Sequence, residues 1–398
     1  MGHTQSSNSI LMIEPVAFGY NYETGRDNEF QMKPQSEKPQ EIVRLARQEM
    51  LDLKAALQSK GVAVISFRGK ETCPDDVFPN NWLSTTTHKD LIVYPMATPS
   101  RSQERRLDIL HWLQNEKDYR LLADFSYAEK SGLALEGTGV LIQDHINKQA
   151  YVARSQRSND ALLAAWSEKT GYETIVFDTE TSDTKQPVYH TNVILHIGTG
   201  YAAICPDTIK KIDRARVLDK LGEKHELISL RFPQIPDFCG NALEVSGTEG
   251  QRYLALSERA YNALDDKQRV QYLKHIEGFV HAPINALTMA NSKPIADTTK
   301  MILLRIQTLL LDIDILKLPV FHSHDAVGEL IDAAVMRNND DATFIGQDML
   351  TDKADDIPAR IALERGCGFI KYQNIGTTYD GPGDSNSLLL ATAEFDWR

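Results

Sequence analysis

The sequence VILHIGTGYAAIC, residues 193–205, carries the clearest fold signal in the chain. Two apolar runs flank the turn residues Gly198, Thr199 and Gly200, which is the pattern of a β-hairpin. A helix-forming stretch follows at 207–222, and the apolar segment ELISLRF follows at 226–232. The sequence therefore predicts the local order strand, strand, helix, strand.

This order recurs on both sides of the hairpin. Before it, the predicted elements are strands at 139–144 and 149–155, a helix at 158–170 and a strand at 173–178. After it come strands at 242–247 and 252–257 and a helix at 258–272. A doubly wound sheet would alternate single strands with helices, whereas a hairpin in each unit favours a propeller-like ring of α/β modules.

The segment before residue 139 contains further strands and helices. We expect strands at 10–18, 62–67 and 91–96, with amphipathic helices at 41–61 and 105–117. The helix at 41–61 has apolar residues at helical spacing and ends at Gly61. The expected class is therefore α/β, with the modules beginning near residue 10.

The character of the sequence changes after residue 287. A strongly apolar, helix-like stretch spans 294–318, and a glycine-rich loop and an apolar strand close the chain at 375–395. We expect a main unit at 10–287, a mainly helical insertion at 288–380, and a terminal loop and strand at 381–398 that return to the main unit. The insertion also contains HSHD (322–325), but alternate residues do not share a helix face, so we predict no metal site there.

Composition excludes several classes of protein. The formal net charge of −12 argues against a nucleic-acid-binding surface, and no apolar run is long enough for a membrane span. The chain begins without the pattern of a secretory signal. Its four cysteines are widely spaced, so we expect no disulfide framework and a reducing, cytoplasmic setting.

Three polar motifs stand beside predicted strands. FPNNW (78–82) pairs Asn80 with Asn81, and two amide side chains can recognise a planar, multi-donor group such as guanidinium. LEGTG (135–139) places Glu136 in a glycine turn, where its carboxylate can pair with guanidinium. HTN (190–192) places His190, a proton carrier near neutral pH, before an apolar strand. Each motif alone is also explained by an Asx turn, a solvated carboxylate or a structural histidine.

Taken together and in order, the motifs resemble a known group of enzymes. GYNYETGRDNEFQ (19–31), PDDVFPNNW (74–82), YPM (94–96), LEGTG, YHTN (189–192), GNALE (240–244) and SERAY (257–261) resemble the arginine deiminase and amidinotransferase superfamily, in its citrulline-utilising branch. The resemblance covers residues 10–285. It implies the pentein fold, a five-bladed, pseudo-symmetric ring of ββαβ units, with the helical insertion placed before the last strand.

The resemblance also implies a chemistry and a set of site residues. Relatives attack the guanidinium carbon with a cysteine thiolate and form a covalent amidino intermediate, while a histidine acts as acid and base. Carried onto this chain, His190 is the acid and base, Glu136 binds the guanidinium, and Asn81 stands where many relatives have Asp. The expected substrate contacts are Asn21, Asp76, Asn80, Asn81 and Asn192.

The nucleophile departs from the family pattern. Relatives carry the catalytic cysteine on the last strand after a triple-glycine loop, and the comparable segment GPGDSNSLLLATAE (381–394) has Ser387 at that position. A serine hydroxyl is far less ionised than a thiol and is a weaker nucleophile without a strong base. Cys73, Cys239 and Cys367 are the alternative nucleophiles, and each is equally compatible with a buried structural cysteine.

Three functions remain open at this stage. The first is a hydrolase that needs no cofactor and acts on a small guanidino or ureido compound such as arginine; replacement of the cysteine by Ser387 would leave it inactive. The second is an amidinotransferase. The third is a non-catalytic pentein that binds a guanidino ligand or another protein. The sequence leaves a homo-oligomer open.

Overall fold

The computed structural model describes residues 5–24, 38–181 and 185–283, all within one compact unit that spans Met1–Lys317. The predicted insertion at 288–380, the terminal segment at 381–398, Cys367 and Ser387 lie outside the described residues. None of the helices in the described ranges is long and apolar enough to cross a membrane.

The hairpin at the centre of the sequence forms as predicted. Strands β9 (Leu195–Gly198) and β10 (Tyr201–Ile204) pair antiparallel, and helix α6 (Lys211–Gly222) leads to β11 (Glu226–Ser229), which pairs parallel with β10. The strand order β11-β10-β9 places the hairpin strand that follows His190 at one edge of this sheet.

Three further sheets repeat this pattern. Their elements are β3 (Leu83–Thr85), β4 (Asp90–Val93), α3 (Leu107–Lys117) and β5 (Arg120–Asp124); β6 (Ile142–Asp144), β7 (Gln149–Ala153), α5 (Asp160–Thr170) and β8 (Glu173–Phe177); and β12 (Leu243–Ser246), β13 (Arg252–Ser257), α7 (Glu258–Ala263), α8 (Asp266–Tyr272) and β14 (Gly278–Ala282). In each sheet an antiparallel pair is followed by a parallel one. The fold is therefore mixed α/β and modular.

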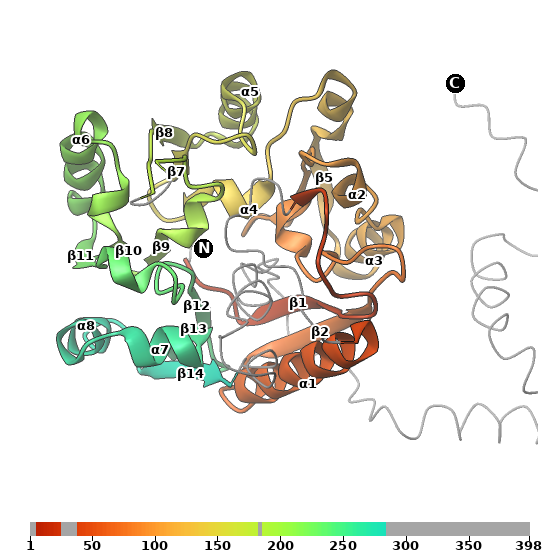
Figure 1. Cartoon of the computed structure of the whole chain (residues 1–398), viewed down its shortest axis with the longest axis horizontal. Helices are drawn as coiled ribbons and strands as arrows, with labels where there is room; N and C mark the ends of the chain where they lie inside the picture. Colours follow the sequence, from red (N-terminus) through yellow and green to blue (C-terminus); the bar gives the residue numbers. More distant parts are fainter. Residues whose placement is uncertain (1–4, 25–37, 182–184, 284–398) are drawn as a thin grey trace, which may run out of the picture. The chain divides into compact units, whose positions relative to one another are not determined.

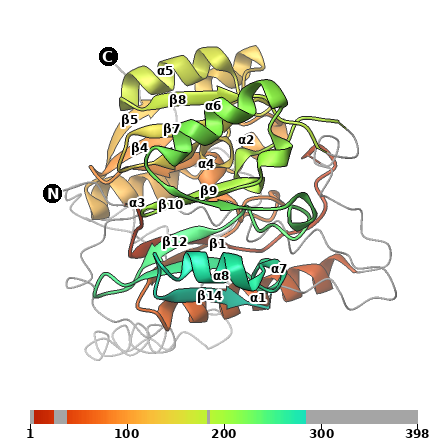
Figure 2. The same cartoon turned by 90° about the vertical axis from the view of Figure 1, so that its left-hand side faces the viewer.

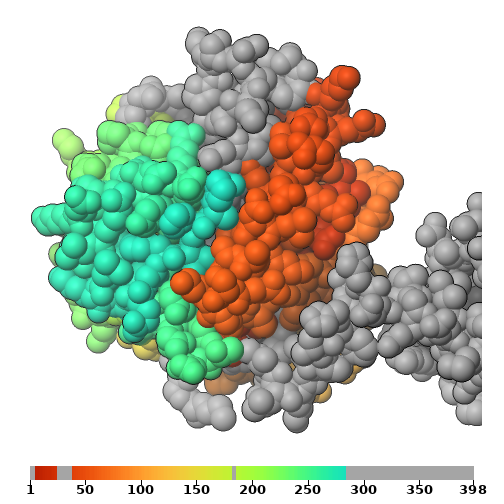
Figure 3. Space-filling model, turned by 90° about the horizontal axis from the view of Figure 1, so that it is seen from below, coloured from red at the N-terminus to blue at the C-terminus, as the bar shows by residue number. Residues whose placement is uncertain are grey.

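The fifth sheet of the described residues contains two strands. β1 (Ser9–Glu14) and β2 (Ala63–Arg68) pair parallel, and α1 (Pro39–Gln58) precedes β2. An apolar stripe at helical spacing on α1 is buried against β1 and β14. In Figure 1 the long helices α1, α3, α5 and α6 lie outside the strands, and Figure 2 shows the same arrangement from the side. Figure 3 shows α1 beside the segment that ends in β14.

The structure differs from the sequence prediction at three places. The predicted helix at 258–272 is two helices, because Asp265 caps α8 by accepting a hydrogen bond from the Gln268 amide. Strands β3, β5 and β14 were not predicted. The segment 139–144, predicted as a strand, begins inside the short helix α4 (Gly137–Val140). This last difference matters for the site, because α4 begins directly after Glu136.

Candidate active site

Glu136 is held at the start of α4 by its own backbone and by the glycine that follows. Its amide donates to the Arg157 carbonyl (3.0 Å), and its carbonyl accepts from Gly139 (3.0 Å). Gly137 has a φ of +38°, and a Cβ there would lie 2.3 Å from the Asn80 carbonyl oxygen. Glycine is therefore required at this position, and its absence of a side chain lets the LEGTG turn pack directly on the FPNNW segment.

His190 and Glu136 form a buried pair. His190 stands just before the short 3-10 helix η4 (Thr191–Val193), and its Nε2 lies 2.8 Å from Glu136 Oε2. Both side chains are fully buried, at 0% exposure. Because a carboxylate can only accept, Nε2 carries the hydrogen of this bond and donates it. The carboxylate thus orients the imidazole and favours its protonated form.

Two buried arginines keep Glu136 ionised. Arg157 Nη1 lies 3.1 Å from Glu136 Oε2, and Arg101 Nη1 lies 3.5 Å from the same oxygen. The Ala97 amide also donates to this carboxylate, at 3.1 Å. Burial by itself raises the pKa of Glu136, but Arg157, His190 and Arg101 outweigh it and hold that pKa well below its ordinary value. Sequence motifs predicted this carboxylate but neither arginine.

Asn81 joins the same cluster. Its Oδ1 accepts from Arg101 Nη1 at 2.9 Å, and Arg101 also makes a two-pronged pair with Glu104, at 2.7 and 2.8 Å. A Cβ on Gly139 would lie 2.4 Å from Asn81 Nδ2 and 3.0 Å from the His190 ring. The Asn81 amide and the His190 imidazole therefore converge on the same glycine, and the structure brings together three of the predicted site residues, Glu136, His190 and Asn81.

Three other predicted substrate contacts, Asn80, Asn192 and Asn21, each make a hydrogen bond within the protein. Asn80 Nδ2 donates to Thr138 Oγ1 at 3.1 Å, so Asn80 fixes the LEGTG turn. The Asn192 carbonyl accepts from Asn241 Nδ2 at 3.0 Å. Asn21 Nδ2 donates to Asp75 Oδ2 at 2.9 Å. Each of these residues is buried, but their bonds within the protein are structural ones.

The neighbouring carboxylates Asp75 and Asp76 have different hydrogen-bond partners. Asp75 is fully buried and accepts from Asn21 and from Thr24 (3.1 Å). Burial lowers the pKa of the Arg101 guanidinium, but Glu104, then Glu136 and, with a smaller contribution, Asp75 outweigh it and raise that pKa. Asp76, the predicted contact, instead accepts from the Lys70 amide and lies against Gly69. The two neighbours differ because successive residues of a loop present their side chains in different directions, which the sequence does not reveal.

Protonation of Asp76 makes the free energy of unfolding depend on pH. Burial raises its pKa to about 6, above the value of about 3.9 for an unfolded chain. The folded state therefore binds the proton more tightly, and this site lowers the free energy of unfolding as the pH rises from about 4 to about 6. We expect Asp76→Asn to raise that free energy at pH 7 by about 3 kcal/mol and to change it little at pH 4. Urea unfolding at both pH values measures this; an equal effect at the two pH values would contradict the assignment.

Comparison with known proteins places this cluster in a family. The sequence profile of eukaryotic N,N dimethylarginine dimethylhydrolase matches residues 14–290. The chain belongs to this family. No curated protein matches the sequence. The matched range contains all of the cluster described above, from Asn21 to His190.

Solved structures support the same fold. The N-terminal domain of ArgZ, an arginine dihydrolase from the ornithine-ammonia cycle in cyanobacteria, has a TM-score of 0.56 at 14% identity, with 75% of this chain and 97% of that domain covered. Unliganded AgrE has a TM-score of 0.57 at 14% identity, with 75% of this chain and 39% of AgrE covered. The chain spans 38% of the whole ArgZ chain. At this identity the likeness is one of fold.

The described cysteines are poor candidates for the nucleophile of such a family member. Cys73 and Cys239 are buried, and burial raises the pKa of both thiols, that of Cys239 to about 12. Cys205 is buried as well, with a pKa raised to about 11. A thiol acts as a nucleophile through its thiolate, and these environments disfavour that form. The remaining candidates, Cys367 and Ser387, lie outside the described residues.

No group of three or more His, Cys, Asp or Glu side chains in the described part of the chain could hold a metal ion. The HSHD segment falls outside that part.

Proposed function

We propose that the protein hydrolyses a small guanidino compound, such as arginine or an N-methylated arginine, to a ureido product. The observation that supports this most strongly is the buried His190–Glu136 pair at 2.8 Å, with Asn81 beside it. A histidine held by an ionised carboxylate is suited to pass protons in both directions near neutral pH. The family match adds that relatives of this chain are hydrolases of guanidino groups.

The proposed reaction has two steps. The nucleophile adds to the guanidinium carbon and its proton passes to His190 Nδ1, since Nε2 is engaged with Glu136. A carbon–nitrogen bond then breaks, and the departing nitrogen takes that proton and leaves as ammonia or an amine. Water adds to the amidino carbon, a proton returns through His190 to the nucleophile, and the bond to the protein breaks. The covalent route divides one difficult displacement into two easier ones.

We assign the nucleophile position to Ser387, as the resemblance implies. The raised pKa values of the Cys73 and Cys239 thiols support this assignment, because neither thiol is activated. We also propose that the five described sheets are the blades of a pentein propeller. The β1–β2 sheet has two strands where the others have three, so the predicted strand at 388–395 is the natural candidate to complete it.

Activity of Ser387→Cys tests the proposal. We expect the parent protein to release little ureido product from arginine and its N-methylated derivatives, and the Cys variant to release at least about 100-fold more, because a thiolate is a far better nucleophile. Colorimetric detection of the ureido product, with ammonia or methylamine measured in parallel, checks this. Ser385→Cys in the same segment is the matched control and should gain nothing.

A non-catalytic guanidino-binding protein is the second candidate, and Ser387 is the feature that favours it. If both proteins are inactive while arginine raises the melting temperature, binding without hydrolysis is the better description. If no guanidino compound stabilises either protein and neither is active, the proposed function is wrong.

A further inference from the structure

The GNALE segment (240–244) takes no part in the proposed chemistry, yet its first residues contact the turn that carries His190. Asn241 Nδ2 donates to the Asn192 carbonyl at 3.0 Å, two residues after His190. The Asn241 and Asn192 side chains are 2% and 0% exposed, so this bond is shielded from water. A buried hydrogen bond of this kind fixes the backbone it joins.

The glycine before Asn241 brings the two backbones together. A Cβ on Gly240 would lie 2.2 Å from the Val193 carbonyl oxygen and 2.7 Å from Ile194 Cα. Any other residue would push the GNALE segment away from η4 and lengthen the Asn241 bond. Glycine at 240 is thus explained by close approach of two chain segments rather than by a turn.

A buried histidine holds Gly240 in place from the other side. His196 Nδ1 lies 2.9 Å from the Gly240 carbonyl, and His196 Nε2 lies 3.2 Å from the Tyr272 hydroxyl. Burial lowers the pKa of His196 to about 4, so its ring is neutral at physiological pH. Because the carbonyl can only accept, Nδ1 donates to it and Nε2 accepts from Tyr272. The donor and acceptor roles are therefore fixed along this chain of bonds.

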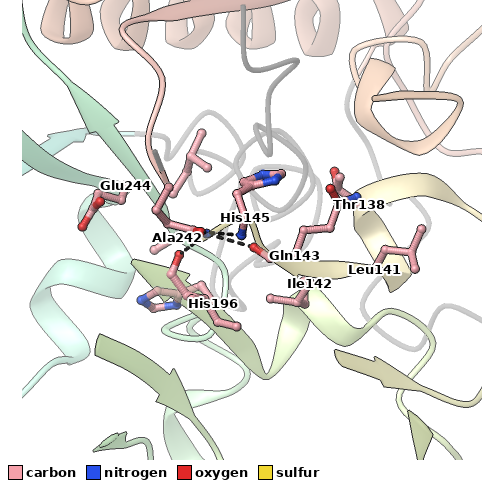
Figure 4. Close-up of a pocket in the computed structure, with 11 residues that line it drawn as sticks. Thr138, Leu141, Ile142, Gln143, His145, His196, Ala242 and Glu244 are labelled. Atoms are coloured by element: carbon pink, nitrogen blue, oxygen red, sulfur yellow. Dashed lines mark hydrogen bonds between the residues drawn. The ribbon is translucent and has the colours of Figure 1, made fainter. Parts of the chain in front are cut away.

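The His190 turn is also held from a second sheet. Thr191 Oγ1 accepts from the Ala153 amide at the end of β7, at 2.8 Å. The turn at 190–193 thus lies between β7 on one side and the GNALE segment, which leads into β12, on the other. Figure 4 shows Ala242 and Glu244 of GNALE lining the same pocket as Thr138 of the LEGTG turn. GNALE therefore contacts the segment that carries His190 and shares this pocket with the turn that carries Glu136.

We propose that Asn241 is a positioning residue that sets the His190 imidazole against Glu136. The effect of Asn241 on catalysis rests on the proposed function, but its hydrogen bond to the His190 turn does not. Loss of the Asn241 bond would free the Asn192 carbonyl and let the turn shift. A displacement of about 1 Å at a catalytic group can lower the rate about 100-fold.

Asn241→Ala in the active Ser387→Cys background is the kinetic test. We expect kcat to fall about 10- to 100-fold with little change in KM, because the substrate contacts remain while the proton carrier is displaced. Thr199→Val is the matched control. It removes the 2.6 Å bond from Thr199 Oγ1 to Glu244 Oε1, which joins the β9–β10 turn to β12 at the other end of GNALE. We expect this variant to lose stability and keep kcat.

A second measurement does not depend on turnover. The proton NMR titration of the His190 ring, assigned by comparison with His190→Asn, reports its pKa in the parent chain and in each variant. The charged groups around the ring are Glu136 and, behind it, Arg157 and Arg101. Separation from the carboxylate disfavours the imidazolium, so we expect the His190 pKa to fall in Asn241→Ala and to stay unchanged in Thr199→Val.

The outcomes separate the two proposals. A lowered His190 pKa in Asn241→Ala supports the positioning role even if no guanidino compound is hydrolysed, in which case only the proposed function fails. An Asn241→Ala protein whose His190 titration and kcat match those of Thr199→Val overturns the positioning role. If the alanine variant does not fold, Asn241→Ser, whose hydroxyl is too short to reach the carbonyl, is read in the same way.

Discussion

His190→Asn in the Ser387→Cys background is expected to lower kcat/KM for the guanidino substrate by about 1000-fold, within the range typical for loss of a general acid and base. The departing nitrogen then has no proton donor held at the site, and water has no base. The asparagine amide ends about where His190 Nδ1 lies, so Glu136 loses the bond from Nε2 but keeps its donors Arg157 and Ala97. Initial rates of ureido product formation over a range of pH measure the effect.

A second buried histidine provides the control for this substitution. His225 Nε2 lies 2.7 Å from Asp144 Oδ2, so this buried pair repeats the contact of His190 with Glu136 but shares no residue with the candidate site. We expect His225→Asn to reduce stability about as much as His190→Asn does and to leave kcat/KM unchanged. If the two variants lose activity equally, the effect is one of folding and His190 has no special role.

Hydrophobic patterning predicted the modules wherever a strand had enough apolar residues to be recognised. The hairpin at 193–205 and its helix were predicted because the apolar runs are continuous and glycines mark the turn. β14 was missed because Gly278 and His281 interrupt its pattern, and its inner face is just Val280 and Ala282. Its pairing with β13 is a tertiary contact, so a short strand of this kind has no local signal.

Sequence motifs predicted the polar residues of the site but not the arginines that balance the charge of its buried carboxylate. Glu136, His190 and Asn81 were found through ordered motifs. Arg101 and Arg157 were missed because, in sequence, each sits among Ser, Gln and other charged residues, as surface cations do. Arg157 meets Glu136 from a segment distant along the chain, whereas Arg101 is shared between Glu136 and Glu104, three residues further on. A charged side chain is buried where it has a partner, and the contact with Glu136 exists only after folding.

The charge balance around Glu136 leads to the second large effect. Glu136→Gln keeps the shape of the side chain but removes the negative charge that faces Arg157 and Arg101. We expect a loss of about 3–5 kcal/mol in the free energy of unfolding at pH 7, as for other broken buried ion pairs. We also expect at least about 100-fold loss of activity in the Ser387→Cys background, because a neutral amide no longer favours the His190 imidazolium.

Glu244→Gln is the control for Glu136→Gln, because it also replaces a buried carboxylate by an amide. Glu244 is also buried, at 2% exposure, but hydroxyl and amide donors of Ser6 and Thr199 hold it. Glutamine has a single acceptor oxygen, which can keep the two hydroxyl donors while the bond from the Thr199 amide is lost, so we expect a smaller loss of stability than in Glu136→Gln. Equal losses in the two variants would show that the arginines around Glu136 contribute little.

The contribution of Glu136 to the free energy of unfolding depends on pH, and its direction follows from the lowered pKa of this carboxyl. The folded-state pKa of Glu136 lies well below the unfolded value of about 4.3, so the ionised carboxylate stabilises the fold above that unfolded value. This stabilisation is lost as the pH falls through the folded-state pKa. The difference in unfolding free energy between the parent and Glu136→Gln should therefore shrink in acid, as the pH falls below about 4. Urea unfolding at neutral pH and at several acid pH values measures it, and a difference that grows in acid would mean that Glu136 is protonated in the folded protein.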